Sequence, residues 1–340
     1  MLTSATQERL LEPRYRRILS FGDVLDESIG LFRRHWLVFA LVSAVCLLPP
    51  GLLTVLIALS GSLDSNTLAR ELGRGGAPTP ATLTRLMGPF LLLYLVTAVF
   101  YLAWTMAIVV TTDEYLHAAE PTPAVILRRT MRRYLPGLLT GIVCALAVAI
   151  LLIPATLLLV LYAFSFPISV LAIVAAIGGI VVWWVRPTWR SIWLKWVIVV
   201  ATPFGLVAYF LGTWSMYLGA VVLEQRGPIP ALRRSMQLVD RHWFRVVAIL
   251  LVASTIVSTL QYLPTMLVQV PLMISNAVRG QLGLGPVELA ISSAVGILAQ
   301  VLFASMATIV YALVFVDLRN RREGTDIAER VSQLEATPNA

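Results

Sequence analysis

One stretch, Pro228 to Trp243 with the sequence PIPALRRSMQLVDRHW, sets the architecture expected of this chain. Its apolar residues are separated by four, three and four positions, and they are Leu232, Met236, Val239 and Trp243. That spacing places them on one stripe of an α-helix. The opposite side carries Arg233, Arg234, Gln237 and Arg241. The stretch therefore predicts an amphipathic helix that begins at Pro228, where a helix tolerates proline.

The same pattern occurs twice more, with starts about 100 residues apart. The stripe of the first copy consists of Leu25, Ile29, Phe32 and Trp36. The stripe of the middle copy, which is weaker, consists of Leu127, Met131, Tyr134 and Leu138. Ser235 aligns with Ser28 in the first copy and with Thr130 in the middle one. Because each copy precedes long apolar runs, we expect three pseudo-repeats.

The composition indicates a chain embedded in a bilayer. Hydrophobic residues make up 58% of the 340 residues and charged residues 13%, and the mean hydropathy is +0.83, whereas a soluble domain carries about 25% charged residues. Six runs contain no Asp, Glu, Lys, Arg or His, and they are 37–63, 88–112, 137–185, 196–223, 246–278 and 289–316. Each can supply a span, since a membrane-spanning helix needs about 20 residues.

The expected fold is all-α, a polytopic transmembrane bundle of six main spans in three hairpins, each preceded by an interfacial amphipathic helix. A single membrane domain covers 21–317, with repeat units at about 21–112, 113–223 and 224–317. A polar tail at 1–20 and a charged tail at 318–340 flank it. An additional apolar segment, 167–185, is expected to be re-entrant or interfacial on the outer side, and a seventh full span is the alternative.

The basic residues predict the orientation of the chain. Segments 1–36, 113–136, 224–245 and 317–340 hold 19 of the 26 Lys and Arg residues. Because Lys and Arg flanks stay on the cytoplasmic side, both termini and all three amphipathic helices are expected to face the cytoplasm from the plasma membrane. The arginines flank apolar spans, so the net charge of +8 is explained without a nucleic-acid partner.

Patterns typical of catalysis are absent from the sequence. It contains no HExxH, GxSxG, P-loop or GxGxxG motif. Its two cysteines, Cys46 and Cys144, lie inside apolar runs without metal-ligand spacing. We therefore expect a protein that is not an enzyme and holds no cofactor or metal ion. Ion-coupled transporters place ionisable groups within the membrane, so the uncharged runs also argue against a proton-driven pump.

The amphipathic helices carry the candidate binding residues. They can lie in the inner membrane interface as structural elements, with Trp36 and Trp243 as anchors in the acyl boundary. They can also form a docking surface for anionic lipid headgroups, or for a membrane or cytoplasmic protein partner. The two interpretations are compatible. The candidate contact residues are Arg34, Arg128, Arg129, Arg233, Arg234 and Arg241.

Three groups of residues resemble a family of bacterial and archaeal membrane proteins. They are Leu19 to Leu25 with Trp36, then Glu224 to Gly227 with Ala231 to Ser235, and finally Tyr311, Asp317-Leu318-Arg319, Arg321 and Glu323 to Asp326. In these residues the chain resembles the glycerophosphoryl diester phosphodiesterase membrane-domain family and its polytopic relatives, without the catalytic phosphodiesterase barrel. The resemblance implies a helical membrane module.

Two functions follow from these observations. We expect a non-enzymatic, multi-pass membrane scaffold or accessory subunit with a basic cytoplasmic interfacial surface. The alternative is a channel-like or lipid-handling transporter that has no ionisable groups within the membrane. A continuous hydrophilic or lipid-width cavity among the spans would favour the transporter.

Overall fold

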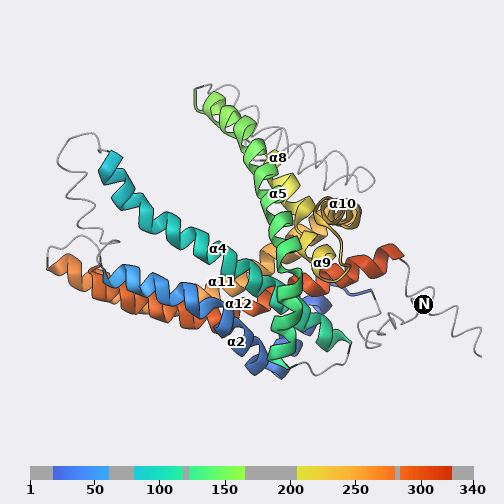
Figure 1. Cartoon of the computed structure of the whole chain (residues 1–340), viewed down its shortest axis with the longest axis horizontal. Coiled ribbons are helices and arrows are strands. Elements are labelled where there is room, and N and C mark those ends of the chain that lie inside the picture. The colour runs from blue at the N-terminus through green and yellow to red at the C-terminus, as the bar shows by residue number, and fades with distance from the viewer. Residues whose placement is uncertain (1–17, 61–79, 118–121, 165–204, 280–283, 324–340) are drawn as a thin grey trace, which may run out of the picture. The chain divides into compact units, whose positions relative to one another are not determined.

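The structure, a computed structural model, describes residues 18–60, 80–117, 122–164, 205–279 and 284–323. Every regular element in these ranges is helical (Figure 1), which confirms the all-α prediction for this part of the chain. The elements are α2 (Phe21–Leu59), α4 (Pro80–Leu116), α5 (Pro123–Phe164), α8 (Gly205–Trp214), α9 (Tyr217–Val222), α10 (Pro228–Val239), the 3₁₀ helix η2 (Asp240–His242), α11 (Trp243–Val278) and α12 (Pro286–Glu323).

Five helical stretches are long and apolar enough to cross a membrane: Phe21–Leu59, Gly88–Leu116, Pro123–Ile150, Pro228–Val278 and Pro286–Glu323. They correspond to five of the six spans expected from the sequence. In the described part of the sixth, 196–223, two shorter helices are found, α8 with 10 residues and α9 with 6. The remainder of that span and segment 167–185 lie outside the described residues.

The amphipathic copies are joined to the spans more closely than expected. At about 1.5 Å per residue, the 39 residues of α2 exceed the roughly 30 Å hydrocarbon core of a bilayer. The first copy occupies the excess, and the helix breaks near the end of that copy, at His35 (φ −124°, ψ 24°). The middle copy continues without a break into the span within α5. The third copy differs from the other two, because a separate short helix, η2, lies between its amphipathic helix α10 and the following helix α11.

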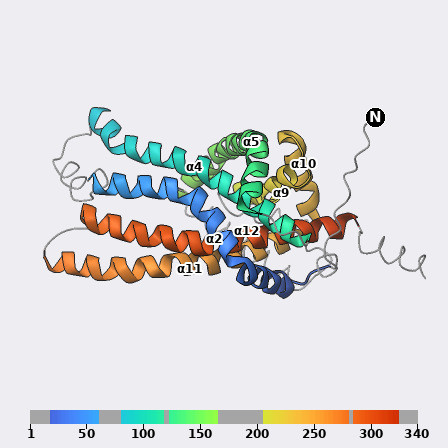
Figure 2. The same cartoon turned by 60° about the horizontal axis from the view of Figure 1, so that its bottom comes forward.

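The chain divides into two compact units, the first formed by residues 1–134 and 249–340 and the second by 135–248. In the first unit α12 packs on α2 and α4. Figure 2 shows α2, α12 and α11 side by side. Of the apolar window of α12, 72% is buried, against 33% for α2 and for α4. The helix α12 is therefore the centre of this unit.

Hydroxyl and glycine contacts hold the first unit together. The indole nitrogen of Trp104 in α4 donates a hydrogen bond of 2.9 Å to Ser43 in α2. Gly51 in α2 lies so close to Ile297 in α12 that a Cβ atom added there would be 2.9 Å from that side chain. Small and hydroxyl residues of this kind allow helices in a membrane to approach closely, because lipid supplies no hydrophobic drive for their association.

In the second unit α10 packs on α8 and α9. The buried Ser235 hydroxyl donates to the carbonyl of Thr213 at 2.7 Å and accepts the amide N–H of Met216 at 3.1 Å. The Trp243 indole donates to the carbonyl of Tyr209 at 3.2 Å. These bonds join the third amphipathic copy to the end of the helix pair that precedes it.

Candidate functional site

All three amphipathic copies bury the same aligned position. Ser28, Thr130 and Ser235 are each at most 2% exposed. Thr130 donates to the carbonyl of Ile126 at 2.9 Å within its own helix, whereas Ser235 donates to Thr213 in a neighbouring helix. The large majority of buried hydroxyls have such a partner. The sequence alignment of the copies thus coincides with a common buried face.

The next position along each helix is apolar and exposed. Ile29 is 48% exposed, Met131 67% and Met236 39%. These residues belong to the apolar stripes identified in the sequence. In the first and middle copies the whole stripe stays partly or fully exposed, whereas in the third copy the other stripe residues, Leu232, Val239 and Trp243, are buried. In water such a pattern would be costly, but an apolar side chain is well solvated by lipid. Exposed apolar side chains of this kind are typical of an interfacial helix.

Two of the six candidate arginines are bound to buried carboxylates. Glu114 at the end of α4 pairs with Arg129 in α5. Glu224, which follows α9, accepts bonds of 2.9 Å from the guanidinium of Arg234 in α10. Arg129 and Arg234 occupy aligned positions, and the Arg234 side chain is only 11% exposed. The same contact therefore fixes the middle and third amphipathic copies to the helix that comes before each.

The other four candidate arginines are Arg34, Arg128, Arg233 and Arg241, and all four are exposed. None of the four forms an ion pair within the described ranges. Arg128 immediately precedes the bound Arg129, and Arg233 precedes the bound Arg234. In both helices one guanidinium therefore holds the fold and its neighbour is available to a ligand.

The two predicted tryptophan anchors lie in different environments. Trp36 is 45% exposed, as an anchor in the bilayer interface would be. Trp243 is 6% exposed and packs inside the second unit against Gly212 and Tyr209. Trp243 directly follows η2, and its indole N–H donates to the carbonyl of Tyr209 in α8.

A third buried carboxylate joins residues from the two ends of the described chain. Asp317, which is 2% exposed, accepts the Leu19 amide N–H at 2.9 Å. Its other oxygen accepts the Arg321 guanidinium at 2.9 Å, and that guanidinium also donates to the Leu19 carbonyl at 2.6 Å. The closing Asp317-Leu318-Arg319 motif singled out in the sequence thus has a structural partner 298 residues away.

Glu224 and Asp317 lie among the residues that carry the family resemblance, but the sequence did not predict that these acids or Glu114 bind arginines. A signal for them exists, because each lies within two residues of the end of an uncharged run. A buried carboxylate is costly unless a group of opposite charge or a hydrogen-bond donor compensates it. An arginine lies 15 residues after Glu114 and 10 residues after Glu224. These acids lie at the boundaries of the uncharged runs and not inside them.

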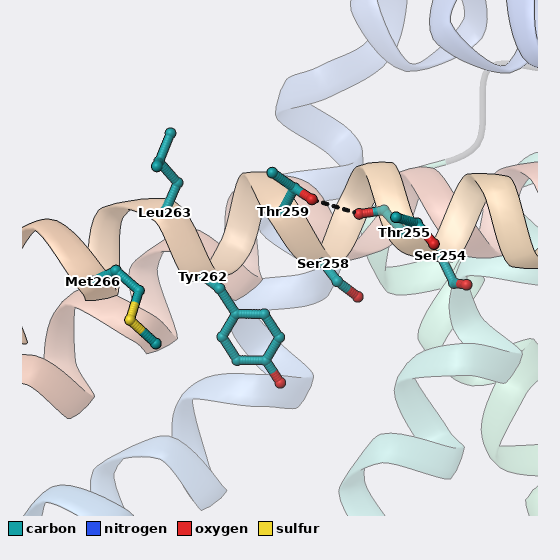
Figure 3. Close-up of a pocket in the computed structure, with 7 residues that line it drawn as sticks. All are labelled: Ser254, Thr255, Ser258, Thr259, Tyr262, Leu263 and Met266. Carbon is teal, nitrogen blue, oxygen red and sulfur yellow. Dashed lines mark hydrogen bonds between the residues drawn. The ribbon is translucent and has the colours of Figure 1, made fainter.

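One open groove lies on α11, with a volume of about 490 Å³. Its lining residues all come from this helix, and they are Ser254, Thr255, Ser258, Thr259, Tyr262, Leu263 and Met266 (Figure 3). Thr255 and Thr259 each donate to the carbonyl four residues earlier. The groove is a shallow surface feature in which these hydroxyls are already bonded to the helix backbone.

Across the ranges that the structure describes, no group of three or more His, Cys, Asp or Glu residues could hold a metal ion. His35 stacks on Tyr115 with ring centroids 3.9 Å apart. His117 lies 3.6 Å from Asp113, one turn away in the same helix. These contacts give both rings a structural role.

Comparisons with protein-family models, with curated proteins and with solved structures found no match. The resemblance to the membrane-domain family therefore stays a prediction drawn from the quoted residues.

Proposed function

We propose that this chain is a non-enzymatic, multi-pass membrane protein that acts as a scaffold or accessory subunit. Its working surface consists of the three amphipathic helices, through which it engages anionic lipid headgroups or a partner that presents a similar charge. The observation that carries this proposal is the pairing of exposed arginines with exposed apolar side chains on helices that continue into or lead to spans. A cation next to lipid-facing apolar residues lies at headgroup depth.

The proposed topology has six spans in three pseudo-repeats, with both termini and every amphipathic helix at the cytoplasmic face of the plasma membrane. The common burial of Ser28, Thr130 and Ser235 supports the repeats. So do the aligned contacts of Arg129 and Arg234 with the acids that follow the preceding apolar runs. The membrane module of the resembled family is compatible with this arrangement.

A direct test is the lipid composition of the purified protein. We expect the wild type to retain anionic lipids above their fraction in the source membrane, and a variant with Arg34, Arg128, Arg233 and Arg241 changed to Gln to lose this enrichment. Quantifying phosphate-containing lipids extracted from both proteins gives the answer. Wild-type protein whose lipids match the bulk membrane would overturn the proposal.

The second candidate is a lipid-handling transporter, and the α11 groove favours it. Serine and threonine hydroxyls line one end of the groove, and Tyr262, Leu263 and Met266 line the other (Figure 3). This order resembles the polar-to-apolar gradient of a lipid. Reconstitution into liposomes with a fluorescent lipid in one leaflet separates the two functions. Faster transfer of that lipid between leaflets would support the transporter, whereas an unchanged rate is expected for a scaffold.

A further inference from the structure

The start of α5 concentrates positive charge more than any other described amphipathic copy. Four arginines occur within six residues there, and they are Arg128, Arg129, Arg132 and Arg133. Side chains four residues apart on a helix are neighbours, so Arg128 lies beside Arg132 and Arg129 beside Arg133. Like charges at this spacing weaken a helix. Glu114 compensates one of the four by pairing with Arg129.

Arg128 and Arg132 both remain exposed, and neither has an ion-pair partner in the described part of the chain. Two exposed apolar side chains accompany them, Met131 at 67% and Leu135 at 63%. At 100° per residue these four positions fall within about 100° of arc on the helix. The same helix continues as an apolar segment to Ile150, long enough to cross a bilayer.

Two exposed arginines beside two exposed apolar side chains match the chemistry of a phospholipid. Two guanidiniums one turn apart match the oxygens of a phosphodiester, since each can donate two hydrogen bonds to an anionic oxygen pair. The apolar neighbours on the same face match the glycerol and upper acyl region of a lipid. A soluble anion would use the arginines and leave Met131 and Leu135 without a contact.

We infer that Arg128 and Arg132 form a binding site for the headgroup phosphodiester of an anionic glycerophospholipid, with Met131 and Leu135 against its acyl chains. This inference rests on the proposed function, because it names the ligand class and the position within the amphipathic surface. The other copies lack the pair. The positions aligned with Arg128 and Arg132 are Arg233 and Gln237 in α10, and Asp26 and Gly30 in α2.

The test counts lipids bound to detergent-solubilised full-length protein by native mass spectrometry during titration with phosphatidylglycerol or phosphatidylcholine. The wild type should prefer phosphatidylglycerol. In R128Q/R132Q this preference should fall by a factor of about 5 to about 30. A decrease of this size corresponds to the loss of one or two arginine contacts with an anionic surface. R128K/R132K keeps the charge and should restore most of the preference. R279Q/R322Q removes the same charge elsewhere and should change it less than about 2-fold.

The outcomes separate the inference from the proposed function. A wild type without preference for phosphatidylglycerol would overturn both. A preference that persists in R128Q/R132Q would overturn only the site assigned to α5. Competition by inorganic phosphate that abolishes the wild-type preference would identify a free-anion site and would also contradict the inference. Equal melting temperatures for R128Q/R132Q and the wild type show that the lost preference is not unfolding, since Arg129 still binds Glu114.

Discussion

Among single residues, Gln225 carries a backbone cost that the turn between α9 and α10 requires. Its φ is 59°, in the left-handed region where a side chain other than glycine crowds the backbone. This conformation reverses the chain so that the Arg226 amide reaches the carbonyl of Ala220 at 3.1 Å. The turn then delivers Glu224 to Arg234. Local strain therefore serves the carboxylate contact that positions α10.

Replacing Gln225 with glycine should raise the stability of the second unit by about 1 kcal/mol, since glycine adopts positive φ without that crowding. The apparent melting temperature in detergent is the measurement. Gln237→Gly is the matched control, because the same change in the exposed helical part of α10 should lower stability by about 1 kcal/mol. A loss of stability in Gln225→Gly would contradict the strain described here.

Gly212 is required by the close approach of Trp243. A Cβ atom at this position would meet the Trp243 indole nitrogen at 2.6 Å and Val247 at 2.9 Å. Gly212→Ala should therefore displace the indole from the Tyr209 carbonyl and lower stability by about 1–3 kcal/mol. Gly30→Ala, where nothing lies within 4 Å of the added atom, should instead gain about 0.5–1 kcal/mol. Equal melting temperatures for the two variants would exclude the contact.

For whole elements, the sequence predicted helices and spans better than their junctions. Apolar runs without charge identified α2, α4, α5, α11 and α12, because a continuous apolar segment satisfies its own backbone groups in lipid by forming a helix. The junctions depend on packing, which periodicity does not report. The break at His35 and the helix η2 occur at aligned Arg-His-Trp triplets, yet α5 has Gly137 at the corresponding position and continues unbroken.

The contact between α10 and the acid that precedes it can be tested directly. Glu224→Gln removes the charge that Arg234 binds while the guanidinium stays largely buried, so stability should fall by about 1–3 kcal/mol. In E224Q/R234M the loss should be smaller than the sum of the single losses, since the two side chains act as a pair. Glu323→Gln, beside the partly exposed Arg319 at 3.7 Å, should change stability by less than about 0.5 kcal/mol. Additive losses would refute the pairing.

Across the whole molecule, the candidate site was predicted only in part. Charge counting located the arginine-bearing helices, because exposed cations at span boundaries are visible in composition. It could not separate Arg128 from Arg129, since two adjacent arginines look alike until the position of Glu114 is known. The assignment of Trp243 as an anchor failed to anticipate its packing on Gly212 for the same reason. Pairing across the fold decides which residues of a basic stretch remain available.

The hydrogen bond from the Leu19 amide to Asp317 connects residues 298 positions apart in the chain, and its loss should destabilise the first unit. Asp317→Ala would leave the Leu19 amide and the Arg321 guanidinium without their buried acceptor. Stability of the first unit should fall by about 3–5 kcal/mol, the usual cost of removing one partner from a buried ionic contact. Melting in detergent and protease cleavage near Leu19 should both report the change. Cleavage at the wild-type rate would show that this contact does not hold the N-terminal segment.

The central claim is that all three amphipathic helices lie at one face of one membrane. Single cysteines at the aligned, exposed positions Gly30, Arg132 and Gln237 test it, in a background with Cys46 and Cys144 replaced by alanine. A membrane-impermeant maleimide is applied to intact cells and to inverted vesicles. We predict labelling of all three positions in inverted vesicles and of none in intact cells. Labelling of any one position from the opposite face would contradict the account.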